Sequence, residues 1–330
     1  MFFNKFRLSD PYRYKIPFLL SVPYFFIAFY HLPFCRSFIL IAVSVIACTG
    51  FAGFGYATND WGDIEKDQIA GKPNSFAELS WLQRILLTLF FAFMAIVCWF
   101  YLPFTWISFI LLSAELILFV VYSFPPFRLK ERGAAGVITD ALYAHTIPAL
   151  FAAYTFGLLS KPNTNQLIEV VIVLAIWQTF SGIRNILFHH LDDHDADIVS
   201  GTRTFATTRG REKVVALLKY FLIPVEVLLF LAYMVLIVLA LNLALALVYL
   251  LCYALLLITT SPDVKNITYK KLCYFFLDDF YLECLPVGLL LFLCLSNIWF
   301  IVLLLFHILI LRKNVFAHFV SKLLLNQWDR

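Results

Sequence analysis

Apolar stretches of roughly 20 residues recur along the whole sequence, and they restrict the fold more than any other feature. A helix of about this length crosses the hydrocarbon core of a bilayer. Hydrophobic residues make up 62% of the 330 residues and charged residues only 14%, whereas soluble domains carry about 25% charged residues. Such a chain lacks the polar side chains to cover itself in water. We therefore predict an all-α, multi-pass integral membrane protein in contact with the lipid bilayer.

Eight membrane spans can be assigned from the hydropathy, to within several residues at each end. They cover 17–34, 37–58, 81–102, 104–124, 134–157, 166–190, 213–234 and 237–259. The region 281–311 is too long for one ordinary helix and short for two, with a candidate break at Ser296 and Asn297. We expect a bundle of nine or ten spans. The predicted organisation is a cytoplasmic leader at 1–16, a membrane domain at 17–313 and a tail at 314–330.

Lys and Arg are concentrated in alternate loops, and the loops between these hold only Arg36 and Lys161. The positive-inside rule places the basic loops in the cytoplasm. The expected location is a bacterial cytoplasmic membrane. The net charge of +4 is modest and the basic residues lie beside apolar segments, so we expect no nucleic-acid partner.

Two acidic blocks in these basic loops share one pattern. The residues Asn59, Asp63, Asp67 and Gly71 are spaced by four, and the same spacing recurs 130 residues later at His189, Asp193, Asp197 and Gly201. Each block follows a predicted span and opens a loop on the same side of the membrane. The repeat indicates two related halves, whose acidic loops would face each other across a shared central cavity.

The spacing of four places the carboxylates of a block along one helical face. Like charges in this arrangement repel each other unless a cation binds between them. Oxygen ligands suit Mg²⁺, which often bridges carboxylates to substrate phosphates. Solvated loop charges would explain a single acidic cluster, but two matched clusters on one side favour a metal site that binds a diphosphate.

A basic segment on the same side, residues 122–132, could bind the phosphate oxygens of such a ligand. Arg128 and Lys130 follow the rigid pair Pro125-Pro126. An Arg binds phosphate through two hydrogen bonds, whereas a Lys acts as a point charge. Lys72 is a further candidate, and a purely topological role of these cations is the alternative.

The motifs together resemble those of the UbiA superfamily of intramembrane prenyltransferases over about residues 17–260. The block Asn59-x3-Asp63-x3-Asp67 resembles the first signature of that family, and Asp193-x3-Asp197, followed by Gly201 and Thr204, resembles the second. The segment between them is similar as well, at Tyr122-Ser123, Pro125-Pro126, Arg128 and Lys130. One departure is Lys72-Pro73, where the family commonly has Arg-Pro.

The resemblance implies a bundle of nine spans around a central cavity, and Mg²⁺-dependent transfer of a prenyl group from a polyprenyl diphosphate to a lipophilic acceptor, expected to be aromatic. The metal ligands would be Asn59, Asp63, Asp67, Asp193 and Asp197, with Asp63 and Asp193 essential for catalysis. The diphosphate would contact Arg128, Lys130, Lys72, Tyr122 and Ser123.

Two other functions remain open from the sequence. A terpene cyclase of the same family would ionise the same diphosphate and then close the prenyl chain on itself. A cation transporter would use the acidic repeats as ion sites, although transport sites are expected near the bilayer midplane and these blocks lie near the membrane surface.

Overall fold

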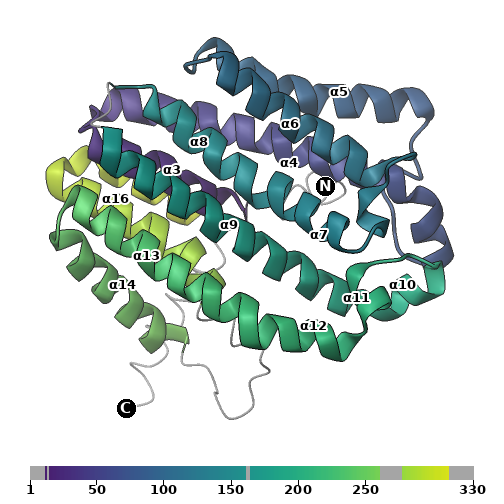
Figure 1. Cartoon of the computed structure of the whole chain (residues 1–330). Helices are drawn as coiled ribbons and strands as arrows, with labels where there is room; N and C mark the ends of the chain where they lie inside the picture. Colours follow the sequence, from purple (N-terminus) through teal and green to yellow (C-terminus); the bar gives the residue numbers. More distant parts are fainter. Residues whose placement is uncertain (1–11, 13–14, 161–163, 261–276, 312–330) are drawn as a thin grey trace, which may run out of the picture. The chain divides into compact units, whose positions relative to one another are not determined.

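The computed structural model describes residues 12, 15–160, 164–260 and 277–311 (Figure 1). Within these ranges every regular element is a helix, which confirms the all-α prediction. The predicted leader 1–16 lies largely outside the described residues, and the predicted tail 314–330 lies entirely outside them.

Five of the described helical segments are long and apolar enough to cross a membrane: Phe34–Ala70, Trp81–Phe100, Trp106–Ser123, Leu167–Asp192 and Arg211–Leu241. Shorter apolar helices cover Ile16–Phe29, Ala244–Leu255, Phe280–Ser296 and Ile298–Leu309. The total of nine or ten spans stays a prediction. Large apolar side chains on the outside of these helices, such as Leu82 at 59% and Leu228 at 67% exposed, are compatible with lipid and not with water.

The chain divides into two compact units, of which the first comprises 46–236 among the described residues. Its helices are α4 (Phe34–Ala70), α5 (Trp81–Val97), α6 (Trp106–Ser123), α7 (Ala134–Ala141), α8 (Ile147–Gly157), α9 (Thr164–Asp192), α10 (His194–Ser200), α11 (Phe205–Arg209), α12 (Arg211–Leu217) and α13 (Ile223–Leu241). The first turns of α4 and the last residues of α13 belong to the second unit. Helices α7 and α8 both pack along α9, as Figure 1 shows.

An aromatic cluster forms part of the core of the first unit. Phe54 on α4 packs with Phe91 on α5 and Phe119 on α6. Phe76, from the segment between α4 and α5, is 1% exposed and completes the cluster. Gly62 lets α4 approach the end of α6 closely, since a Cβ there would lie 2.7 Å from the carbonyl oxygen of Ser123. These contacts hold the segment 71–80 against the three helices that precede and follow it.

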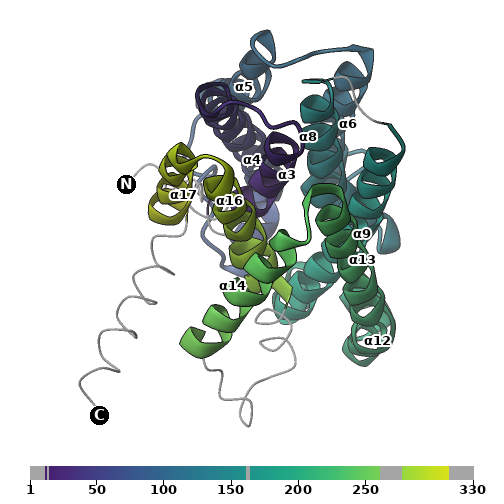
Figure 2. The same ribbon diagram turned by 90° about the vertical axis from the view of Figure 1, so that its left-hand side faces the viewer.

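Among the described residues, the second unit comprises 12, 15–45, 237–260 and 277–311. Its helices are α3 (Ile16–Phe29), α14 (Ala244–Thr260), α16 (Leu285–Ser296) and α17 (Ile301–Phe306). Helix α16 packs against α3, α14 and α17, and Figure 2 shows α16 and α17 side by side. The side chain of Asn297 caps the turn that starts at Ile298, so the predicted break at Ser296 and Asn297 is confirmed.

The helix that carries the first acidic block is longer than the hydropathy suggests. The second predicted span ends at residue 58, but α4 continues without interruption to Ala70. The polar residues after Thr58 are compatible with a helix even though they are unfavourable in hydrocarbon, so the drop in hydropathy marks the exit from lipid and not the end of the helix. The block at 59–67 is therefore helical and does not open a loop. Helix α9 similarly runs to Asp192, two residues beyond the predicted 190.

Candidate functional site

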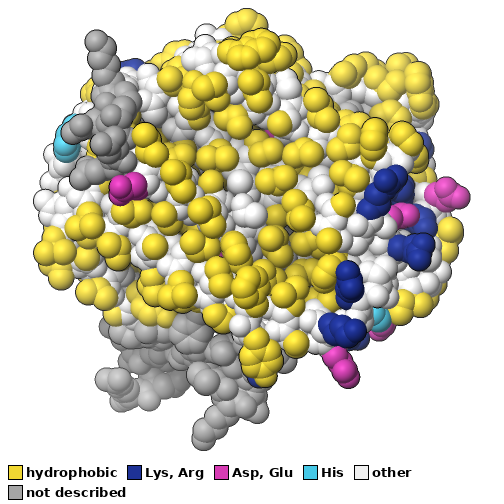
Figure 3. Space-filling view, in the orientation of Figure 1, with side chains coloured by type: hydrophobic (Ala, Val, Ile, Leu, Met, Phe, Trp, Pro, Cys, Tyr) yellow, Lys and Arg dark blue, Asp and Glu magenta, His cyan; other side chains and the backbone are white. Residues whose placement is uncertain are grey.

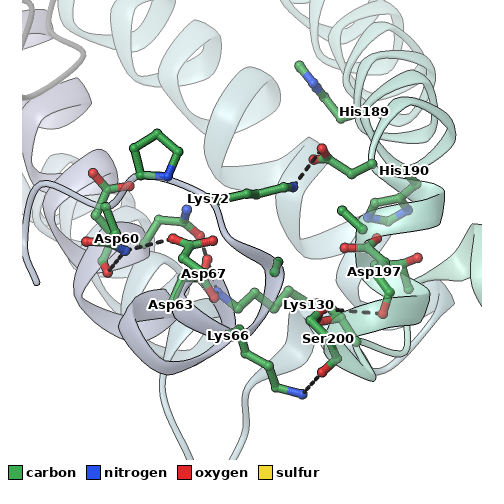
Figure 4. A pocket seen from close by; sticks show the side chains of 18 of the residues that line it. Asp60, Asp63, Lys66, Asp67, Lys72, Lys130, His189, His190, Asp197 and Ser200 are labelled. Atoms are coloured by element: carbon green, nitrogen blue, oxygen red, sulfur yellow. Dashed lines mark hydrogen bonds and ion pairs between the residues drawn. The ribbon is translucent and has the colours of Figure 1, made fainter.

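A cavity of about 720 Å³ in the first unit is lined by residues of both acidic blocks (Figure 4). The first block contributes Asn59, Asp60, Asp63 and Asp67 from the last three turns of α4. Because these turns are helical, the spacing of four directs Asn59, Asp63 and Asp67 to one face. That face forms one wall of the cavity.

The second block forms another wall. Asp193 links α9 to α10, and Asp197 lies on α10. His189 and His190, on the last turn of α9, line the cavity beside them. Residues of both acidic blocks thus line one cavity, which confirms that the blocks face a shared cavity.

The sequence repeat extends to the backbone. Helices α4 and α10 both end at a glycine in the left-handed conformation, Gly71 and Gly201, each with φ of 66°. The amide N–H of the next residue, Lys72 or Thr202, donates to the carbonyl oxygen of Asp67 or Asp197 at 2.8 Å in each case. This is a Schellman ending. The glycines are needed for this backbone angle and not for space, since a Cβ at either position would meet nothing within 4 Å.

Lysine side chains bind the carboxylates on both walls. The Lys130 ammonium donates to Asp63 and, at 3.4 Å, to Asn59 Oδ1. The Lys72 ammonium reaches across the cavity and donates to Asp193 Oδ1 at 2.8 Å, as Figure 4 shows. Lys66 donates to the carbonyl oxygen of Ser200 at 3.0 Å. Lys66 and Lys72 thus join the two acidic blocks directly.

Arg128 is engaged differently. Its guanidinium donates to Asp63 Oδ1 at 3.1 Å, to Glu131 at 2.5 Å and to the carbonyl oxygens of Gly62 and Ser123 at 2.7 and 3.4 Å. The residue has φ of 39°, a left-handed angle that costs a non-glycine residue about 1–2 kcal/mol. These hydrogen bonds offset the cost, and they hold the basic segment against the end of α4.

Burial and neighbouring charges shift the pKa values of two lysines and one aspartate in the cavity. Burial lowers the pKa of Lys130, although neighbouring Asp63 opposes the shift. Partial burial alone would lower the pKa of Lys72, but the carboxylates of Asp193, Asp197 and Asp67 raise it above its ordinary value. Burial raises the pKa of Asp197 to about 6. The cavity therefore stabilises a cation beside Asp193 and Asp197.

Most of the residues predicted to form the site line this cavity: Asn59, Asp63, Asp67, Lys72, Tyr122, Lys130, Asp193 and Asp197. Arg128 and Ser123 are not among the lining residues, and the guanidinium of Arg128 is directed at protein acceptors. Sequence reasoning assigned no role at the site to the lining residues Asp60, Asn74 and Thr204, although Thr204 belongs to the motif that resembles the second signature. Asn74 and Thr204 are 130 residues apart, and each lies three positions after the last residue of its block, Gly71 or Gly201. Extending the comparison of the two blocks by three positions would therefore have paired them.

The donors of the cavity suit a hard divalent cation. Within the described residues, no three His, Cys, Asp or Glu side chains are close enough together to bind one ion by themselves. Mg²⁺ does not need such a group, because it commonly takes one or two carboxylates and completes its shell with water and phosphate oxygens. The lysine ammonium groups on Asp63 and Asp193 show that both carboxylates are placed to receive a cation. The residues present therefore fit a magnesium ion on each wall.

Comparisons with known proteins bear on the family and on the fold. A model of the UbiA prenyltransferase family matches residues 16–278, and no curated protein matches the chain by sequence. Solved structures of a UbiA homologue from Archaeoglobus fulgidus are similar in fold. The form bound to DMAPP and Mg²⁺ has a TM-score of 0.57 at 18% identity, covering 89% of this chain and 99% of that one. The form bound to GPP and Mg²⁺ has 0.55 at 17%, covering 86% and 99%. The form bound to Cd²⁺ has 0.53 at 15%, with the same coverage.

Proposed function

Because this chain belongs to the UbiA prenyltransferase family, we propose that it transfers a prenyl group from a polyprenyl diphosphate to a lipophilic, aromatic acceptor and releases diphosphate. The observation that carries the proposal is that both acidic blocks and three lysines, Lys66, Lys72 and Lys130, converge on one cavity. Carboxylates together with ammonium groups are what a diphosphate with divalent cations requires. The A. fulgidus homologue was solved with DMAPP or GPP and Mg²⁺, which supports the same substrate class here.

Magnesium, when bound, would neutralise charge on the leaving diphosphate. Asn59, Asp63 and Asp67 are the proposed ligands on one wall, and Asp193 and Asp197 those on the other. Asp63 and Asp193 each bind a lysine in this structure. These lysines would donate to diphosphate oxygens instead of to the carboxylates when the substrate enters.

Lys130 and Lys72 differ in how far each side chain would have to move to exchange its carboxylate for a phosphate oxygen. Lys130 has a side chain 10% exposed and is fixed beside Asp63, so it can bind a phosphate oxygen without a large movement. Lys72 is 37% exposed and lies across the cavity on Asp193. Release of this contact opens the space between the two acidic blocks. We propose that Lys130 and Lys72 together stabilise the negative charge that grows on the departing diphosphate.

One aromatic side chain at the cavity wall would accompany the prenyl group, with two more rings packed behind it. Tyr122 lines the cavity, and its ring lies edge-on to Tyr143 at a centroid distance of 5.1 Å. Tyr143 in turn packs on Phe119 at 4.5 Å. Ring faces stabilise a cation, so this group suits the allylic carbon as it becomes positive.

The basic edge of the molecule fits a cytoplasmic position for the cavity. On the face drawn in Figure 3, most Lys and Arg side chains gather at the edge where Figure 1 places α10, α11 and α12, and the rest of that face is largely hydrophobic. By the positive-inside rule we propose that the cavity opens toward the cytoplasm. Labelling of single cysteines near α12 from either side of a sealed membrane would test this orientation.

The test of function is product formation by the purified protein in lipid nanodiscs. Prenyl diphosphates of several lengths would be supplied with Mg²⁺ or with EDTA, and with or without a lipid extract as the source of acceptor. Mass spectrometry should find a prenylated lipid only with Mg²⁺ and the extract. Hydrocarbon or terpene alcohol without the extract would identify a cyclase, and cation flux into liposomes without diphosphate release would identify a transporter.

A further inference from the structure

Asn74, three residues after Gly71, holds the last carboxylate of the first acidic block. Its Nδ2 donates to Asp67 Oδ2 at 2.7 Å and to the carbonyl oxygen of Asp60 at 2.8 Å. Its Oδ1 accepts from the backbone N–H groups of Phe76 and Ala77 at 2.9 and 3.2 Å. Backbone groups therefore hold both the Nδ2 and the Oδ1 of the Asn74 side chain. The amide held in this way favours one orientation of the Asp67 carboxylate.

Thr204 occupies the equivalent place in the second block. It is 5% exposed and lines the same cavity. Its hydroxyl lies beside the Asp197 carboxylate and interacts with it, and it also donates to Thr207 Oγ1 at 3.4 Å. The Thr204 hydroxyl oxygen caps α11 by accepting the N–H of Thr207 at 3.4 Å. Thr204 thus lies between the last carboxylate of its block and the backbone that follows, as Asn74 does.

The two contacts have a common geometric origin. Asn74 and Thr204 each lie seven residues after the last aspartate of their block. Between them and that aspartate lies the same left-handed glycine turn, at Gly71 or Gly201. The turn reverses the chain, so that the seventh residue returns to the carboxylate. The repeat therefore includes a polar side chain directed at each terminal aspartate.

We propose that Asn74 and Thr204 are positioning residues that orient Asp67 and Asp197 for a divalent cation, a role that rests on the function proposed above. Hydrogen-bond partners of ligating carboxylates hold the ligand in one rotamer, and their loss typically weakens metal binding 10–100-fold. Neither residue needs to touch the substrate for this role. An amide serves on one wall and a hydroxyl on the other, because both can donate one hydrogen bond to a carboxylate.

The test uses substitutions that separate positioning from folding. Asn74→Ser keeps an oxygen that can accept from the backbone of the turn, but is too short to reach Asp67. Thr204→Val removes the hydroxyl at nearly constant volume, and Thr204→Ser restores it. Ser80→Ala is the control for lost capping, because the Ser80 side chain caps α5 and is not a cavity-lining residue.

Two readouts are measured for each variant in nanodiscs: the Mg²⁺ concentration that gives half-maximal diphosphate release, and the rise in melting temperature that Mg²⁺ causes without substrate. We expect Asn74→Ser and Thr204→Val to raise the half-maximal Mg²⁺ concentration about ten-fold and to reduce the Mg²⁺-induced rise. Thr204→Ser should restore both values. Ser80→Ala should lower the melting temperature without Mg²⁺ and change neither readout.

Two results would overturn the proposal: wild-type Mg²⁺ dependence in both variants, or an equal change in Ser80→Ala. If the wild-type protein releases no diphosphate, the proposed function fails. The Mg²⁺-induced rise in melting temperature still tests the positioning role in that case, because it does not require turnover.

Discussion

The ion pair between Arg184 on α9 and Glu226 on α13 joins two membrane helices, and the loss of unfolding free energy on its removal can be predicted. Arg184 Nε donates to Glu226 Oε2 at 2.6 Å, and Nη2 donates to Oε1 at 3.1 Å. Both side chains are 0% exposed. Glu226→Gln keeps the shape of the side chain but removes the negative charge that Glu226 presents to the guanidinium inside the bundle. Removal of one partner of such a pair costs about 3–5 kcal/mol.

The double variant Arg184→Met with Glu226→Leu should behave in the opposite way. It removes both charges at similar volume, and replacement of a whole buried pair by apolar residues is often neutral or stabilising. The coupling energy is the stability loss of the double variant minus the summed losses of Arg184→Met and Glu226→Leu. It should therefore be about as large as that sum. Reversible unfolding in mixed micelles, followed by circular dichroism, would give these free energies.

The reasoning is refuted if Glu226→Gln costs less than about 1 kcal/mol, the value expected of an exposed pair. It is also refuted if the double variant loses as much stability as the two single changes added together, because the interaction would then carry none of the cost.

Three further predictions concern the site and its support. Gly71→Ala and Gly201→Ala should each lower the unfolding free energy by about 1 kcal/mol, because both positions require φ of 66°; unchanged melting temperatures would contradict this. Burial raises the pKa of Asp197 to about 6. Between about pH 4 and 6 the folded, metal-free protein therefore binds more protons than the unfolded chain. Its stability should fall as the pH rises through that window. Asp197→Asn should remove this dependence, measured as the melting temperature against pH in EDTA. Phe76→Ala should cost about 3–5 kcal/mol, since the ring is 1% exposed in the aromatic core, and a smaller loss would show that the segment 71–80 does not depend on it.

Much of the site was predictable because it depends on periodicity. The spacing of Asn59, Asp63 and Asp67 predicts one helical face, and α4 presents these residues to the cavity. The repeat of this spacing at Asp193 and Asp197 predicts a second wall of the same cavity, and the structure contains it. Whether these residues bind metal stays a prediction.

What the sequence did not reveal depends on contacts between distant segments. The role of Arg128 as a phosphate ligand stays a prediction, and its contacts could not be foreseen: its guanidinium donates to Asp63, Glu131 and two carbonyl oxygens. The role of Asn74 could not be read from a pattern of charges, because an amide carries none. Hydropathy also placed the end of α4 too early, since it reports the membrane boundary and not the hydrogen bonds of the helix.

The central claim is that carboxylates of both acidic blocks bind divalent cations that in turn bind a diphosphate. Anomalous diffraction from crystals grown with Mn²⁺ and a non-hydrolysable prenyl diphosphate analogue tests it most directly. We predict one manganese peak at Asp63 and Asp67 and another at Asp193 and Asp197, with the diphosphate between them and the Lys72 ammonium displaced from Asp193. A diphosphate bound by lysines alone, with no metal on either block, would contradict the account.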